Sequence, residues 1–266
     1  MKQRSAAVRL LQISDTHCYA DDGVRLAWTK SVVYPNRSLL RLLTHLESQK
    51  KPFDALVISG DLVQEETAAT YRRYREILQD FHWPVYILPG NHDVPELMHS
   101  ELATAEHIHF QFHEQFSGWH CLFLNTHRDG HAEGYLETEQ LIAVEEQLNQ
   151  LKANEHALLF MHHHPVPIGS SWMNRLGLQH AGIFWSLLAQ FPQVKAVSFG
   201  HIHSEFSQDY CINQHRVIQT FSTPATCVQI KHTDEKLRFD HTRPAWRELT
   251  LHADGQLDTC VHYLPD

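Results

Sequence analysis

Residues 8–17 read Val8-Arg9-Leu10-Leu11-Gln12-Ile13-Ser14-Asp15-Thr16-His17, an apolar run followed at once by an aspartate and a histidine. The run Val8–Ser14 is short and mostly aliphatic, which predicts a buried β-strand. Asp15 and His17 would then lie just beyond the carboxyl end of that strand, where open α/β sheets bind their ligands. The stretch therefore predicts a strand and, directly after it, the first part of a metal site.

The same pattern of an apolar run followed by a longer polar-apolar segment recurs over the first 200 residues. Five further runs predict buried strands: Ala55–Ser59, Val85–Leu88, Cys121–Asn125, Ala157–Met161 and Ala196–Phe199. The segments between them predict helices at about 36–50, 67–80, 95–116, 137–152 and 180–190. Alternating strands and helices predict a layered α/β domain.

The pattern changes to antiparallel strands after about residue 204. Phe206–Tyr210 and Arg216–Phe221 flank the polar residues 212–214 and predict a hairpin. Trp246–His252 and Leu257–Tyr263 flank an Asp-Gly turn and predict a second one. Because no linker or repeat interrupts the chain, we expect one domain over residues 1–266.

Further polar residues come after the other predicted strands. Asp61, Asn91, His162, His201 and His203 stand directly after strands two, three, five and six. The carboxyl ends of parallel strands meet at one edge of a sheet, so these side chains should gather there with Asp15 and His17. Glycines precede Asp61, Asn91 and His201, where the backbone must turn sharply.

The types of these seven side chains suit a pair of metal ions. We expect one site from Asp15, His17, Asp61 and His203, and the other from Asp61, Asn91, His162 and His201. A bridging Asp61 would hold the ions roughly 3.5–4 Å apart, as in two-metal hydrolytic sites. Carboxylate, amide oxygen and imidazole favour Mn, Fe or Zn, and none of the five cysteines belongs to the set.

Together the motifs DxH, GD, GNHD and GHxH and the strand-end histidine resemble those of the calcineurin-like metallophosphoesterases. Further segments are similar to the bacterial class III cyclic-nucleotide phosphodiesterases: residues 162–167, 169–172, 222–229 and 246–255. The resemblance implies a four-layer α/β/β/α metallophosphoesterase sandwich with antiparallel C-terminal strands. It also implies an iron and/or manganese pair, with zinc possible, and hydrolysis of 3′,5′-cyclic AMP to 5′-AMP.

One ligand has to be chosen from three consecutive histidines, His162, His163 and His164. The family pattern and the phase of the strand favour His162, with His163 as the alternative.

The hypothesis for the reaction is attack by a hydroxide that bridges the two metals. We expect His92 to act as the general acid on the leaving oxygen, and Asp93 to accept a hydrogen bond from the His92 ring. A turn or helix-cap role is the alternative for Asp93.

The residues expected to bind the substrate phosphate are His17, Asn91, His92 and His203. Trp172 could stack on the base or pack its loop onto the core.

The composition limits the partners that we expect. The net charge is −9, with 22 Lys and Arg against 31 Asp and Glu, which argues against duplex nucleic acid. The apolar stretch before Asp15 is too short for a signal peptide, and no run approaches a membrane span. We therefore predict a cytoplasmic enzyme, with a homodimer possible, that acts on a small-molecule cyclic nucleotide.

Two alternatives stay open at the level of the sequence. The first is another metallophosphoesterase that acts on 2′,3′-cyclic nucleotides or on other phosphodiesters. The second is a metal-binding scaffold without catalysis, which is disfavoured because all seven ligand residues and His92 are present.

Overall fold

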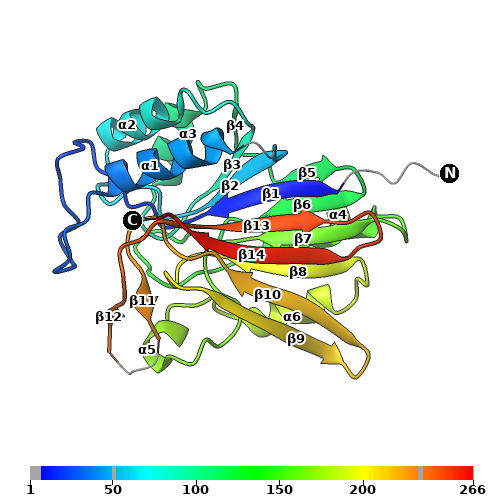
Figure 1. Cartoon of the computed structure of the whole chain (residues 1–266). Helices are drawn as coiled ribbons and strands as arrows, with labels where there is room; N and C mark the ends of the chain where they lie inside the picture. The colour runs from blue at the N-terminus through cyan, green and yellow to red at the C-terminus, as the bar shows by residue number, and fades with distance from the viewer. Residues whose placement is uncertain (1–6, 50–51, 233–235, 266) are drawn as a thin grey trace.

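Two six-stranded mixed sheets lie face to face, with helices on their outer faces (Figure 1). The computed structural model describes residues 7–49, 52–232 and 236–265. The first sheet has the order β14-β13-β1-β2-β3-β4. Its strands are β1 (Val8–Ile13), β2 (Ala55–Ser59), β3 (Val85–Leu88), β4 (Ile108–His109), β13 (Ala245–Leu251) and β14 (Leu257–Tyr263).

The second sheet has the order β5-β6-β7-β8-β10-β9. Its strands are β5 (His113–Phe116), β6 (Trp119–Phe123), β7 (His156–Phe160), β8 (Val194–Phe199), β9 (Phe206–Asn213) and β10 (Arg216–Ser222). A small separate ribbon pairs β11 (Ile230–Lys231) with β12 (Arg238–Phe239). In each large sheet the central strands run parallel, β1-β2-β3 in the first and β6-β7-β8 in the second.

Three hydrophobic cores hold these layers together. The helices α1 (Pro35–Ser48), α2 (Ala68–Leu78) and α3 (Pro95–Leu102) cover the outer face of the first sheet. The outer face of the second sheet packs on α4 (Thr138–Asn149), the short α5 (Ser171–Asn174) and α6 (Ala181–Leu188). Side chains from both sheets, such as Leu10, Trp119 and Phe160, fill the space between them. This arrangement is the predicted α/β/β/α sandwich.

Local sequence accounts for where the helices form. In α1, Pro35 occupies the first turn, and Leu39, Leu42, Leu43 and Leu46 recur at helical spacing and are buried. In α2, the Thr67 side chain accepts a hydrogen bond from the backbone N–H of Thr70 at 3.2 Å and caps the helix. The predictions at 67–80, 137–152 and 180–190 are confirmed, with ends that differ by a few residues.

The helix predicted over 95–116 is wrong beyond Leu102. The chain instead forms β4, which pairs in parallel with β3, and β5, which pairs antiparallel with β6. The apolar residues of this segment, Ile108, Phe110, Phe112 and Phe116, are spaced by even numbers. That spacing is the period of a strand, and it could have corrected the prediction.

Both C-terminal hairpins are confirmed, and they extend different sheets. The strands β9 and β10 continue the second sheet, because β10 pairs in parallel with β8. The strands β13 and β14 continue the first sheet, because β13 pairs antiparallel with β1. The first hairpin turns at Gln214 and His215, slightly later than predicted. No described helix has the length and apolar character needed to cross a membrane.

Candidate metal centre

The polar residues beyond the strand ends converge at one end of the two sheets, and most of them have an unusual backbone. Seven described non-glycine residues have positive φ, and five of these are proposed ligands: Asp15, His17, Asp61, His201 and His203. Such conformations cost of order 1–3 kcal/mol each and cluster at functional sites. The sharp turn after each strand aims the side chain back across the strand ends.

Asp61 lies between two histidines that come from different sheets. Its Oδ2 is 3.7 Å from Nε2 of His17, which stands after β1, and 3.4 Å from Nε2 of His162, which stands after β7. The Asp61 side chain is almost fully buried. One carboxylate oxygen therefore faces both halves of the donor set, as a bridging ligand must.

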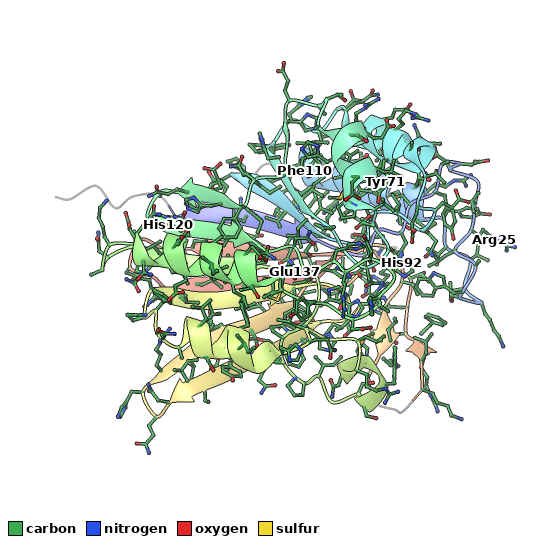
Figure 2. The ribbon with its side chains drawn as sticks, turned by 180° about the vertical axis from the view of Figure 1, so that it is seen from behind. Arg25, Tyr71, His92, Phe110, His120 and Glu137 are labelled. Carbon is green, nitrogen blue, oxygen red and sulfur yellow. The ribbon has the colours of Figure 1, made fainter. Side chains whose placement is uncertain are left out.

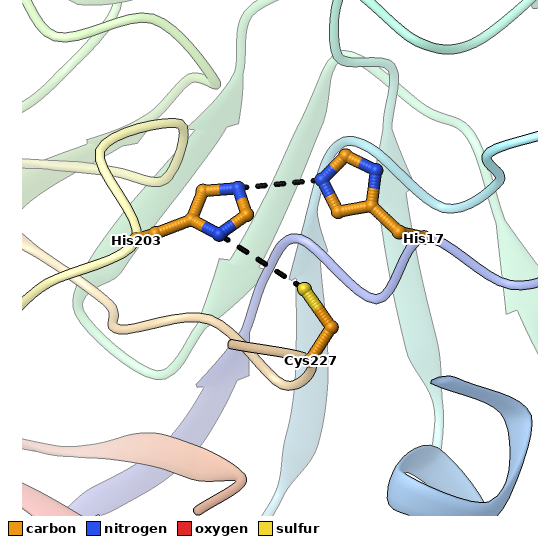
Figure 3. Close-up of side chains that lie close together, drawn as sticks. All are labelled: His17, His203 and Cys227. Carbon is orange, nitrogen blue, oxygen red and sulfur yellow. Dashed lines mark hydrogen bonds between the residues drawn. The ribbon is translucent and has the colours of Figure 1, made fainter. Parts of the chain in front are cut away.

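The first donor set gathers around His203, and Figure 3 shows two of its members, His203 and His17. Nε2 of His203 lies 3.3 Å from Nε2 of His17 and 3.3 Å from Oδ1 of Asp15. All three side chains are buried. Together with Asp61, these residues form the first of the two predicted sites, and nitrogen and carboxylate donors meet there without intervening apolar groups.

The second donor set contains His162 and Asn91. Nε2 of His162 lies 3.2 Å from Oδ1 of Asn91, and His162, Asp15 and Asp61 form a cluster of metal-ligand type. His201 joins this side through a second cluster with His162 and His163. The backbone N–H of His201 donates to Oδ2 of Asp15 at 3.0 Å and so fixes the loop after β8 against the loop after β1.

Carbonyl oxygens orient two of the imidazole rings. Nδ1 of His162 lies 2.7 Å from the Ser59 carbonyl oxygen, and Nδ1 of His203 lies 2.9 Å from that of Val228. A carbonyl can only accept, so each Nδ1 carries a proton and donates. Nε2 is then the nitrogen of each ring that faces the Asp61 and Asp15 carboxylates, and metal-ligating histidines are usually held in this way.

The choice between His162 and His163 is supported by these contacts. Nε2 of His162 points at Asp61 and Asn91, whereas Nδ1 of His163 lies 2.8 Å from the Thr126 hydroxyl. Both rings are fully buried. The geometry therefore favours His162 as the ligand, in line with the sequence pattern.

The donor set fits a pair of cations. Two buried atoms that could bind a metal, Oδ1 of Asp15 and Nε2 of His201, have no hydrogen-bond partner among the described residues. Buried polar atoms are normally satisfied, and a metal ion can satisfy those that lack a hydrogen-bond partner. The oxygen and imidazole donors suit Mn, Fe or Zn.

Burial and the neighbouring carboxylate shift the pKa values of two histidines of the donor set in opposite directions. Burial alone would lower the pKa of His162, but the nearby Asp61 carboxylate outweighs it and raises the pKa to about 9. Burial dominates at His17 and lowers its pKa to about 3.

His92 adjoins the donor set without belonging to either predicted site. Its backbone N–H donates to Oδ1 of Asp61 at 2.8 Å, and its ring lies edge-on to His17 with a centroid separation of 5.0 Å. The ring is partly exposed. Figure 2 shows His92 at the same end of the molecule as Tyr71 and Arg25, with His120 at the other end.

The predicted hydrogen bond from the His92 ring to Asp93 requires a correction. The Asp93 carboxylate instead accepts from the backbone N–H groups of Gly90 at 2.9 Å and Leu62 at 3.2 Å, and from the Tyr71 hydroxyl at 3.1 Å. These donors come from three places: Gly90 lies in the turn between β3 and α3, Leu62 follows β2, and Tyr71 belongs to α2. Burial raises the pKa of Asp93 to about 6. Asp93 anchors the loop that carries Asn91 and His92.

Three further residues near the donor atoms are not indicated by the sequence pattern. The buried thiol of Cys227 lies 3.9 Å from Nδ1 of His203 (Figure 3). The ring of Trp28 lies edge-on to His17 and His203, at 5.6 and 5.8 Å. Nδ1 of His127 lies 2.8 Å from the Gly90 carbonyl oxygen. These residues belong to loops, and no local pattern places them beside the strand ends.

Trp172 is the residue considered for base stacking. Its ring packs beside His232 at 6.1 Å and against the core of the second sheet. That position favours the packing role over contact with a base.

Comparison with known proteins agrees with this geometry. A family model described as calcineurin-like phosphoesterase matches residues 8–205, which contain every proposed ligand. The chain belongs to this family. The family implies a two-metal centre in this phosphoesterase, in agreement with the two donor sets that share Asp61.

The phosphoesterase is similar to bacterial proteins over nearly its whole length. It is 37% identical over 263 residues to the 3′,5′-cyclic adenosine monophosphate phosphodiesterase CpdA of Escherichia coli, covering 98% of this chain and 91% of the relative. The protein of the same name from Vibrio vulnificus is 32% identical over 271 residues, covering 98% and 93%. A solved dimetal phosphatase from Danio rerio shares the fold, with a TM-score of 0.65, 12% identity and coverage of 97% and 99%.

Proposed function

We propose that this phosphoesterase hydrolyses 3′,5′-cyclic AMP to 5′-AMP. The observation that carries the proposal is likeness over nearly the full length to relatives named as 3′,5′-cyclic adenosine monophosphate phosphodiesterases. The likeness includes the C-terminal strands β13 and β14, which lie outside the part matched by the family model. The buried donor sets beside a partly exposed His92 provide the chemistry that such a reaction needs.

The role of the donor sets is to hold two metal ions, which we propose to be iron and/or manganese, with zinc also compatible. Asp15, His17, Asp61 and His203 would hold one, and Asp61, Asn91, His162 and His201 the other. When bound, the pair would activate water and neutralise charge on the phosphoryl oxygens. Two of the imidazole rings are oriented before metal binds, because the carbonyl oxygens of Ser59 and Val228 accept hydrogen bonds from His162 and His203.

His92 is the residue that we assign to the leaving group. It comes after Asn91, its backbone N–H donates to Asp61, and it lines a cavity together with other residues of this loop. A protonated imidazole there can hold a phosphoryl oxygen and donate its proton to the 3′ oxygen as the phosphorus–oxygen bond breaks. We assign contact with the substrate phosphate to His17, Asn91 and His203 as well.

The substrate is a small molecule in this proposal. The net charge of −9 disfavours a duplex nucleic acid, since such binding relies on many Lys and Arg contacts to phosphates. A single phosphodiester needs only the local positive charge of the metal pair.

A panel of substrates tests the proposal. The protein, reconstituted with Mn or Fe, is assayed on 3′,5′-cyclic AMP, 3′,5′-cyclic GMP, 2′,3′-cyclic AMP and bis(4-nitrophenyl) phosphate. We expect the highest kcat/KM for 3′,5′-cyclic AMP. Turnover of the aryl diester without turnover of any cyclic nucleotide would reject the substrate and leave the metallophosphoesterase assignment intact.

A further inference from the structure

A cavity of about 340 Å³ opens beside His92. One wall is the loop after β3, with Asn91, His92 and Val94, and Glu66 lies next to it. The opposite wall is the loop 127–132, which comes after β6 in the second sheet. The volume is at the lower end of the range of roughly 300–1,000 Å³ that is usual for small-molecule sites. The cavity is therefore large enough for part of a nucleotide.

The loop 127–132 is hydrogen-bonded to the loop after β3, which carries Asn91 and His92. Nδ1 of His127 lies 2.8 Å from the Gly90 carbonyl oxygen, and its Nε2 lies 2.9 Å from Oδ1 of Asp129. The His127 side chain is only 9% exposed. This contact joins the two walls of the cavity, so the distance between the far wall and His92 is set by the fold.

One polar atom in the far wall is oriented and available to a ligand. Nδ1 of His131 lies 2.7 Å from Oε1 of Glu133, so this nitrogen carries the proton and donates to the carboxylate. In the neutral ring, Nε2 then has a lone pair and can accept a hydrogen bond. Among the described residues, Nε2 of His131 has no partner, and His131 lines the cavity.

The assigned role of His92 determines which part of the substrate lies here. The leaving 3′ oxygen must come within hydrogen-bond reach of the acid that protonates it. In a 3′,5′-cyclic nucleotide the neighbouring carbon carries the 2′-hydroxyl, which is the only free hydroxyl of the sugar. A 3′ oxygen beside His92 therefore brings the 2′-hydroxyl to the cavity.

We propose that this cavity receives the nucleoside part of the substrate and that Nε2 of His131 accepts a hydrogen bond from the ribose 2′-hydroxyl. The inference rests on the proposed function. This hydrogen bond would make the Glu133–His131 pair a determinant of specificity for ribose over deoxyribose. The two substrates would bind the same metal centre.

The test compares full-length, metal-reconstituted wild type, His131→Ala and His252→Ala. His252 is the matched control, because it pairs with Asp258 at 2.8 Å and is 36% exposed, against 39% for His131, but lies outside the cavity. Each protein is assayed on 3′,5′-cyclic AMP, on its 2′-deoxy analogue and on bis(4-nitrophenyl) phosphate, which has no nucleoside. Glu133→Ala serves as a second variant that removes only the orienting carboxylate.

We expect wild type and His252→Ala to prefer cyclic AMP over the 2′-deoxy analogue by about 3- to 10-fold in kcat/KM, the value of one neutral hydrogen bond. His131→Ala should lose this preference, mainly through KM, and keep its activity on the aryl diester. Glu133→Ala should lose part of the preference for cyclic AMP over the 2′-deoxy analogue.

Three results would overturn the inference. An unchanged preference in His131→Ala would reject it while the proposed function stands. An equal loss on the aryl diester would show that His131 supports the centre as a whole. Absence of cyclic nucleotide turnover in wild type would reject the proposed function and, with it, this inference.

Discussion

Asp61 is the residue on which both donor sets depend. Its Oδ2 faces His17 and His162, and its Oδ1 accepts from the backbone of His92 at 2.8 Å. Replacing Asp61 with Asn keeps the shape of the side chain but removes the charge that both cations would share in the proposed centre. We expect Asp61→Asn to lose both metals and to lose turnover by more than the roughly 10- to 100-fold typical for a hydrogen-bond partner of a ligand. Metal analysis of the purified variant checks this, and retention of a complete pair would refute the bridging role.

His92 should behave differently, because we assign it to the leaving group and not to either metal ion. We expect His92→Ala to lower kcat on cyclic AMP by roughly 10²–10⁴-fold, the usual contribution of a general acid. Metal content should stay close to that of wild type, and the same analysis measures it. A parallel loss of metal would make His92 a ligand or a structural residue.

Asp93 should act on stability more than on the chemical step. Its carboxylate is the acceptor for two buried backbone N–H groups and for the Tyr71 hydroxyl, and each orphaned donor costs about 1–3 kcal/mol. We expect Asp93→Ala to lower the free energy of unfolding by about 2–4 kcal/mol, measured by urea denaturation. The exposed Asp80→Ala serves as the control. If stability is unchanged and only kcat falls, Asp93 acts through His92, as the sequence suggested.

At the residue scale, the sequence pattern identified the side chains that stand at strand ends and missed those that loops bring to the site. The seven proposed ligands stand directly after apolar runs, where position and chemistry point to one site. Cys227, Trp28 and His127 reach the same region only because long connections fold back over it. The contacts of Asp93 were also unpredictable, because they depend on the direction of a buried side chain within a turn.

At the scale of elements, the continuous aliphatic runs gave the most accurate predictions. The short aliphatic runs form β2 and β3 with the predicted bounds, Ala55–Ser59 and Val85–Leu88. The helix prediction is wrong for residues 103–116, where the apolar positions are few and have the even spacing of a strand. The two strands of this segment, β4 and β5, join different sheets, and such pairing depends on partners that are far away in the sequence.

The turn after β2 lies very close to His162 and to the backbone of Gly90, and a substitution at Gly60 tests whether the site needs this close packing. Gly60 has a φ of +96°, and a Cβ there would lie 2.5 Å from Nδ1 of His162 and 2.7 Å from the backbone nitrogen of Gly90. Forced overpacking costs about 1–3 kcal/mol, and the backbone strain adds to it. We expect Gly60→Ala to lower both the free energy of unfolding and metal affinity, measured by denaturation and metal titration.

Gly118→Ala is the matched control for this substitution, because a Cβ at Gly118 meets no atom within 4 Å. Equal metal affinity in Gly60→Ala and Gly118→Ala would show that the site tolerates a larger distance between the turn after β2 and His162.

At the scale of the whole molecule, the metal pair should bind the two sheets to each other. Asp15, Asp61 and Asn91 stand after strands of the first sheet, and His162, His201 and His203 after strands of the second. Metal at 1,000 times its dissociation constant stabilises a fold by about 4 kcal/mol. We expect chelation to lower Tm by roughly 10 °C, and added Mn to restore it, in thermal unfolding monitored by circular dichroism. A Tm that does not respond to chelation would contradict the proposed link between the sheets.

The most direct measurement for the central claim is the identity of the product that the metal-reconstituted protein forms from 3′,5′-cyclic AMP, determined by ³¹P NMR. Because His92 is assigned to the 3′ oxygen, we predict 5′-AMP as the product of wild type and none from Asp61→Asn. Formation of 3′-AMP, or no reaction of cyclic AMP under conditions in which the aryl diester is cleaved, would contradict it.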